Sequence, residues 1–122
     1  MKKILIILFL LIGPFLIWAQ SPQYSTGDYA ASITITVDTS KVAGSTDLAD
    51  FPMLVDITDP ALRNSANGGY MEHANGYDIL FSGDCGAALH HDIESYVEAS
   101  GRLIVWVRIP VLYANQNTEI KL

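Results

Sequence analysis

The run "RLIVWVRIPVL", residues 102–112, constrains the fold more than any other stretch of the chain. Successive side chains of a β-strand point to opposite faces, so Leu103, Val105 and Val107 share one side with Ile109. The opposite side carries Arg102, Ile104, Trp106 and Arg108. One side is therefore purely aliphatic and the other is mixed, which is typical of a strand with a single buried face.

Five other segments have a similar strand-like character. They are residues 32–38, 51–59, 77–82, 87–98 and 118–122. Turn signals separate them about every ten residues, and residues 39–50 are expected to form a loop. The one helical signal is Asp59-Pro60, a capping residue followed by a first-turn proline, which predicts a short helical turn over 60–67. These patterns predict an all-β fold, an antiparallel β-sandwich of the jelly-roll or Ig-like kind, over residues 29–122.

The first nineteen residues have the layout of a secretory signal peptide. Lys2 and Lys3 precede an apolar run from residue 4 to 17, and Ala19 offers a small residue for cleavage. The run is shorter than the ~20 apolar residues that a membrane span needs. An uncleaved anchor is the alternative. We therefore expect residues 1–19 to be a signal peptide, residues 20–28 a linker, and the mature protein to be secreted or displayed on the cell surface without a membrane span of its own.

The charge of the chain limits its partners. The formal net charge is −6, and two of the seven Lys and Arg residues lie in the leader, whereas all thirteen Asp and Glu follow it. An acidic surface repels phosphate backbones, which disfavours nucleic acid as a partner. Cys85 is the only cysteine, so an internal disulfide is excluded and the core must hold the fold. Cys85 is interpreted as a small turn residue, with a bond to another chain, or to a segment missing from this sequence, as the alternative.

The sequence "HHDIE", residues 90–94, raises the question of a metal or catalytic site. His90, Asp92 and Glu94 would project from one face of a strand, with neighbours ~6.5–7 Å apart, so they are poorly placed to converge on one zinc ion. Asp92 and Glu94 also suit the spacing of a glycosidase pair, but so small a fold has little depth for a cleft. We interpret His91, Asp92 and Glu94 as a structural polar cluster, with His91 half-buried and bonded to a backbone carbonyl or an acid.

Other candidate ligand-binding residues are acids near strand ends and exposed aromatic residues. Calcium accepts loosely arranged oxygen ligands, and Asp56, Asp59, Asp78 and Asp84 could supply them, although no Asp-x-Asp-x-Asp-Gly loop occurs. Trp106 is expected in the core beneath a second sheet, with a sugar-stacking platform as the alternative. Loop tyrosines could contact glycans; the candidates are Tyr70, Tyr77 and Tyr113. No nucleophile motif or phosphate loop indicates catalysis, and no cofactor is implied.

Four runs occur in an order and spacing that resemble a known bacterial family. The runs are "DFPMLVDITDPAL", "ANGYDILFSGDCGAAL", "HHDIESYVEASGRLIVWVRIPVL" and "NTEIKL". They are similar to the module called domain of unknown function 2341, over residues 29–122. His91, Ile93 and Glu94 match the family's His-x-Ile-Glu pattern, and Trp106 matches its Trp. Members usually continue beyond the last strand with an aromatic pair, Gly and Asn, so we expect this chain to be truncated within an incomplete final strand.

The resemblance implies a part of a large exported or surface protein, often adjacent to lectin-like sandwich domains, and no enzymatic activity. We expect a non-catalytic β-sandwich module for adhesion, binding or domain presentation, whose partners are other domains of the same polypeptide and, through its aromatic residues, glycans. Two alternatives remain open. One is an ancillary, glycan-binding domain of a polysaccharide-degrading enzyme, and the other is a calcium-dependent binding module.

Overall fold

The computed structural model describes residues 29–122, and the predicted signal peptide and linker lie outside the described residues. Six strands form two antiparallel three-stranded sheets. One sheet has the order β1-β6-β3 and contains β1 (Thr34–Val37), β6 (Thr118–Lys121) and β3 (Ser82–Gly83). The other has the order β2-β5-β4 and contains β2 (Leu48–Thr58), β5 (Arg102–Leu112) and β4 (His91–Val97). No α-helix occurs in residues 29–122, and the predicted all-β class is confirmed.

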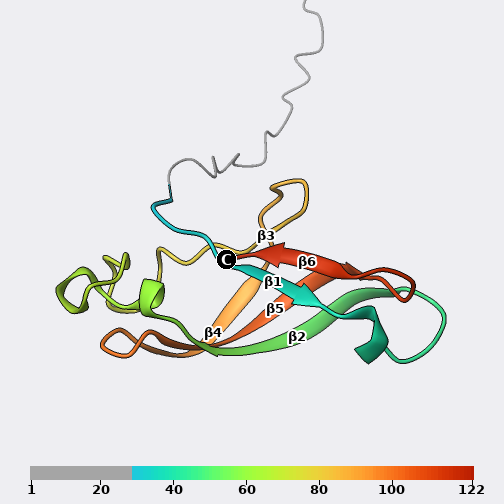
Figure 1. The fold of residues 1–122 in the computed structure, drawn as a ribbon, viewed down its shortest axis with the longest axis horizontal. Coiled ribbons are helices and arrows are strands. Elements are labelled where there is room, and N and C mark those ends of the chain that lie inside the picture. The colour runs from blue at the N-terminus through green and yellow to red at the C-terminus, as the bar shows by residue number, and fades with distance from the viewer. Residues whose placement is uncertain (1–28) are drawn as a thin grey trace, which may run out of the picture.

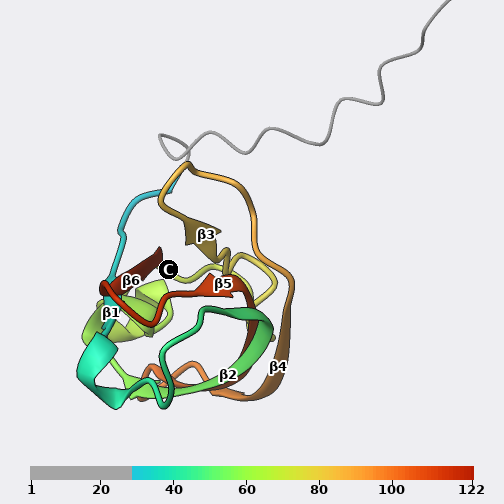
Figure 2. The same cartoon turned by 90° about the vertical axis from the view of Figure 1, so that its right-hand side faces the viewer.

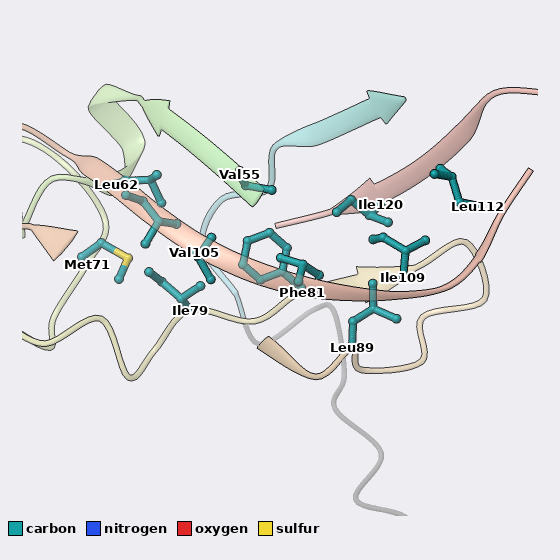
Figure 3. Packing of buried hydrophobic residues seen from close by; sticks show 12 residues of the cluster. Val55, Leu62, Met71, Ile79, Phe81, Leu89, Val105, Ile109, Leu112 and Ile120 are labelled. Carbon is teal, nitrogen blue, oxygen red and sulfur yellow. The ribbon is translucent and has the colours of Figure 1, made fainter. Parts of the chain in front are cut away.

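The two sheets share one apolar core. In both views β2 and β4 lie below β3 and β6 (Figures 1 and 2). Buried side chains of β5 meet Val55 of β2 and Ile120 of β6, and Phe81 lies in the middle of the cluster (Figure 3). The buried hydrophobic residues are Val55, Leu62, Met71, Ile79, Phe81, Leu89, Leu103, Val105, Val107, Ile109, Leu112 and Ile120. The purely aliphatic face of β5 is therefore the one that packs against the rest of the molecule.

The prediction for residues 102–112 is correct over its whole length, and the prediction for residues 118–122 is correct to within one residue. The first strand is shorter than expected, but Ile33, Ile35 and Val37 do pack against the core. The second strand begins three residues before the predicted Phe51, so the expected loop over 39–50 ends early. Leu48 pairs with Leu112 and packs on the core, which extends the ladder at this end.

Residues 77–82 are not the strand that their alternation predicted; only Ser82 lies in one. Ile79 and Phe81 are buried as the pattern requires. However, the Gly76 N–H donates to the His73 carbonyl at 2.9 Å and the Ile79 N–H to the Gly76 carbonyl at 3.0 Å. These turn bonds keep the backbone out of a ladder, so burial and strand pairing are separate properties here.

The predicted helical turn over 60–67 is split in two. A 3-10 turn spans Pro60–Leu62, where the Asp59 side chain accepts from the Ala61 N–H at 2.8 Å, and a second spans Ser65–Asn67. Between them the backbone is extended, and the Asn64 N–H donates to the Glu98 carbonyl at 3.0 Å. That bond ties the segment to the β4–β5 turn and interrupts the helix.

The predicted strand over 87–98 is shortened and contains a bulge. β4 begins only at His91, and its register against β5 shifts between Ile93 and Ser95. Alternation predicts Ile93 and Val97 on the same side of this strand as Leu89, and Tyr96 on the opposite side with Glu94. This holds up to Ile93 and inverts afterwards, so Tyr96 packs on the core and Val97 is exposed. One extra residue exchanges the two faces of a strand, because the side-chain period is two.

Candidate functional site

Trp106 lies in the middle of the central strand of the β2-β5-β4 sheet, with its side chain exposed. The residue is 44% exposed, although its neighbours Val105 and Val107 are fully buried. The expectation that Trp106 lies in the core is therefore wrong. The other sheet packs against the Val105 side of β5, and within residues 29–122 no second layer covers the Trp106 side.

The strand register places Trp106 between two different neighbours. Leu54 of β2 lies opposite it on one side and Asp92 of β4 on the other. Leu54 is 47% exposed, so the side chains of Leu54 and Trp106 lie next to each other on the solvent-exposed surface. Opposed side chains in an antiparallel pair have Cβ atoms ~4.5–5.5 Å apart, which makes Leu54 and Trp106 one continuous apolar surface.

Glu94 anchors the indole. Its position at the β4 bulge brings the carboxylate to Trp106, whose Nε1–H donates to Glu94 Oε2 at 3.0 Å. A hydrogen bond to a charged acceptor is stronger than one between neutral groups. The bond fixes one edge of the indole ring and leaves both faces of the ring free to contact a ligand. The bulge therefore orients the exposed tryptophan through Glu94.

Two ion pairs flank the apolar centre on the same side of β5. Arg102 lies 3.3 Å from Asp56 Oδ2, and Arg108 lies 2.9 Å from Asp50 Oδ1, with a hydrogen bond from its Nε at 3.0 Å. All four side chains are at least half exposed, so these pairs add little to stability. Their main effect is to neutralise both guanidinium groups of the face.

These residues define a surface that we call the Trp106 face. It consists of Asp50, Leu54, Asp56, Asp92, Glu94, Arg102, Ile104, Trp106 and Arg108. Sequence alternation already placed Arg102, Ile104 and Arg108 beside Trp106. The contributions of Leu54 and Asp50 were missed, because they depend on how β2 pairs with β5.

Two of the loop tyrosines, Tyr70 and Tyr77, lie elsewhere with Asp78, at two cavities around residues 70–80. Tyr70, Asp78 and Tyr29 line a cavity of about 490 Å³, and Tyr77 and Tyr29 line a second of about 430 Å³. Asp78 Oδ2 accepts from the backbone N–H groups of Glu72 and His73 at 2.7 and 3.3 Å. Asp78 Oδ1 is buried and has no hydrogen-bond partner among the described residues.

Tyr113 is separated from the other loop tyrosines. It lies in the β5–β6 turn, at the opposite end of the molecule from residues 60–76 (Figure 1). Its backbone N–H donates to Thr118 Oγ1 at 3.1 Å, which helps to close that turn. Tyr70, Tyr77 and Tyr113 therefore do not form a single binding surface.

The four candidate calcium ligands have separate roles. Asp56 pairs with Arg102, Asp59 caps a 3-10 turn, Asp78 fixes the 72–78 loop, and Asp84 is exposed in the β3–β4 turn. Among residues 29–122, no three His, Cys, Asp or Glu side chains are gathered where they could hold a metal ion. The structure does not bring these acids together.

His91 is also separate from its acidic neighbours. Its ring lies on the core side of β4, with Nδ1 3.2 Å from the Leu89 carbonyl oxygen and its centroid 5.2 Å from that of Phe81. Asp92 and Glu94 are exposed on the other side. The residues predicted as one polar cluster are thus divided between the core and the Trp106 face.

Tyr96 is a structural residue that sequence alternation missed. Its hydroxyl donates to the Leu62 carbonyl at 2.7 Å, which ties β4 to the Pro60–Leu62 turn. Burial raises the pKa of the Tyr96 phenol, and the negative charges of Asp78 and Glu98 raise it further. The bulge turns Tyr96 inward, and nothing in the residue pattern marked it.

Comparisons with family models, with curated proteins and with solved structures found no match to the chain. The resemblance to domain of unknown function 2341 therefore stays a prediction. Within residues 29–122, no helix has the length and apolar character required to cross a membrane. Cys85 is exposed.

Proposed function

We propose that this chain is an exported, non-catalytic β-sandwich module of a larger bacterial surface or secreted protein, and that it binds its partner through the Trp106 face. The sandwich is supported by two antiparallel sheets whose side chains meet in one core. Export is supported by the charged and apolar leader. The family resemblance points the same way.

The observation that carries the binding role is the exposed, hydrogen-bonded Trp106. Tryptophan is enriched at the energetic centres of interfaces because it presents a large rigid surface at small entropic cost. Folding alone gives no reason to leave such a side chain exposed. Both arginines beside it are paired with aspartates, and Glu94 accepts from the indole itself, so these groups are not directed at a reacting centre, which favours binding over catalysis.

Binding can be tested with the purified chain and envelope material from bacterial cells. We expect the wild-type chain to be retained by immobilised envelope and Trp106→Ala to be retained at least about tenfold less, since tenfold corresponds to 1.4 kcal/mol. Tyr29→Ala is the matched control, because it removes another exposed aromatic side chain that is neither part of the face nor a candidate ligand-binding residue. Equal retention of Trp106→Ala and wild type would refute the proposed role of the face.

Export has its own test. Mass spectrometry of the protein recovered outside the cytoplasm should show a chain that lacks residues 1–19. An intact chain found only in the cytoplasm would contradict this part of the proposal.

The second candidate is an ancillary glycan-binding domain of a polysaccharide-degrading enzyme. The same exposed tryptophan flanked by carboxylates favours it. The downstream reading frame separates the candidates, because only this one requires a hydrolase domain there.

A further inference from the structure

We infer that the ligand of the Trp106 face is a neutral, hydroxyl-rich glycan chain that runs along β5 with one sugar ring stacked on Trp106. The inference rests on the proposed function and adds the chemical class of the partner. Three features of the face carry it: its charge balance, its hydrogen-bonding groups and its shape.

The charge balance disfavours an anionic ligand. Both guanidinium groups of the face are already paired, Arg102 with Asp56 and Arg108 with Asp50. Within residues 29–122, no cationic side chain forms a salt bridge with Asp92 or Glu94. The face therefore carries more acid than base, and a uronic acid polymer or a phosphate-bearing surface would meet repulsion.

The hydrogen-bonding groups match hydroxyls. Ionised carboxylates can only accept hydrogen bonds, so a ligand that contacts Asp92 and Glu94 must supply hydrogen-bond donors. A sugar hydroxyl is a donor that carries no charge. Guanidinium N–H groups that the ion pairs leave free can donate to hydroxyl or ring oxygens. The C–H face of a pyranose suits the apolar face of the indole, whose own N–H is already occupied by Glu94.

The shape matches an extended chain. Arg102 and Arg108 lie six residues apart on β5, and a strand rises ~3.3 Å per residue, so the two ion pairs are roughly 20 Å apart. Three strands spaced ~4.8 Å apart give a strip about 10 Å wide. A stable protein interface buries ~800 Å² on each partner around an apolar centre. Here the apolar centre is Leu54, Ile104 and Trp106, and exposed Pro52 and Val97 lie at its ends, opposite Arg108 and Arg102. This narrow strip is small for a protein and adequate for a chain of sugar rings.

The first test uses the full chain in a Trp18→Phe background, so that Trp106 is the only tryptophan. Cellohexaose, xylohexaose and mannohexaose are titrated, with hexagalacturonic acid as the charged probe, while Trp106 emission and the heat of binding are recorded. We expect saturable binding of at least one neutral hexasaccharide at millimolar concentration or below, and weaker binding of the uronate. No response to any neutral sugar, or a preference for the uronate, overturns the inference.

Variants locate the site and test its charge logic. We expect Trp106→Ala to weaken neutral sugar binding at least about tenfold by calorimetry, Trp106→Phe to weaken it less, and Tyr29→Ala to leave it unchanged. Asp50→Asn with Asp56→Asn frees both guanidinium groups with little change of shape. The double variant should bind hexagalacturonic acid several-fold more tightly relative to the neutral sugar. Its affinity for hexagalacturonic acid should also fall as the salt concentration rises. An unchanged ratio contradicts the charge argument.

A third measurement separates this inference from the proposed function. Envelope material is oxidised with periodate, which cleaves vicinal diols, or digested with protease, before retention of the chain is measured. Loss after periodate alone supports a glycan. Loss after protease alone, still dependent on Trp106, overturns the glycan inference and leaves the binding role standing. Thermal melting of each variant ensures that a loss of binding is not a loss of fold.

Discussion

At the residue scale, Gly101 has the most demanding conformation in the β4–β5 turn. Its φ is +71°, and a Cβ there would lie 2.1 Å from the Asp59 carbonyl oxygen. Gly86 has nearly the same φ, +74°, with nothing within 4 Å of its Cβ position. At both positions a larger residue would have to adopt a left-handed backbone conformation. Of the two, only Gly101 also has backbone atoms that block the position of a Cβ.

We predict that Gly86→Ala lowers the free energy of unfolding by about 1–2 kcal/mol, the cost of the left-handed conformation. Gly101→Ala should lower it by roughly 3 kcal/mol or more, because the Asp59 backbone must also move. Urea denaturation of both variants provides the comparison. Equal losses of unfolding free energy in the two variants would show that the backbone at Asp59 moves aside at no measurable cost.

Tyr96 predicts a dependence of stability on alkaline pH. Its pKa in the folded protein lies above the ordinary value of 10.0, so as pH rises the unfolded chain loses this proton first. The stabilisation is complete below pH 10 and is lost as pH rises through the folded-state pKa. Tyr96→Phe removes the hydrogen bond to Leu62 and should cost about 1 kcal/mol at pH 8. The gap between wild type and variant should narrow by pH 11 in urea denaturation, and a constant gap would contradict the assignment.

Side chains were predictable from the sequence where local alternation decides their direction. Arg102, Trp106 and Arg108 were correctly placed on one side of a strand. Whether that side is covered depends on where the other sheet packs, which residues 102–112 do not encode by themselves. The Trp106–Glu94 bond depends on a bulge in a neighbouring strand, so neither its existence nor its geometry could be read from the spacing.

At the element scale, β5 is the central strand of its sheet, and both β2 and β4 form their backbone ladders with it. It pairs with β2 and β4, and its inner side chains Leu103, Val105 and Val107 are completely buried. Its period-two pattern was clear in the sequence, and the prediction of its bounds was correct. Residues 77–82 had a similar pattern, but only Ser82 lies in a strand, because local hydrogen bonds within residues 73–79 compete with a ladder.

Val107 and Val111 allow a matched test of burial within β5. Val107 is fully buried and Val111 is 38% exposed. Val107→Ala should cost about 2 kcal/mol, from ~0.8 kcal/mol for each lost CH₂-sized group plus a cavity. Val111→Ala should change stability by no more than about 0.5 kcal/mol. Similar losses in urea denaturation would indicate that a partner or a second copy covers the outer side of β5.

At the scale of the whole molecule, the distribution of acids predicts the response to calcium. Asp56, Asp59, Asp78 and Asp84 each have a separate environment, and no metal-binding group of three occurs within residues 29–122. A cation that binds only the folded state must raise the melting temperature. We therefore expect thermal melting to give the same midpoint with millimolar calcium as with a chelator. A rise with calcium would revive the calcium-dependent alternative.

The pairing of β2 with β5 also governs the time the molecule needs to fold. Leu48 lies against Leu112, so nearly the entire described chain must be present before the longest ladder can close. Contacts between residues far apart in sequence slow folding, and domains rich in them take milliseconds to seconds. Under the export proposed above, such slow closure would leave the chain unfolded when it is handed to a translocase, with the apolar side of β5 still accessible to a chaperone.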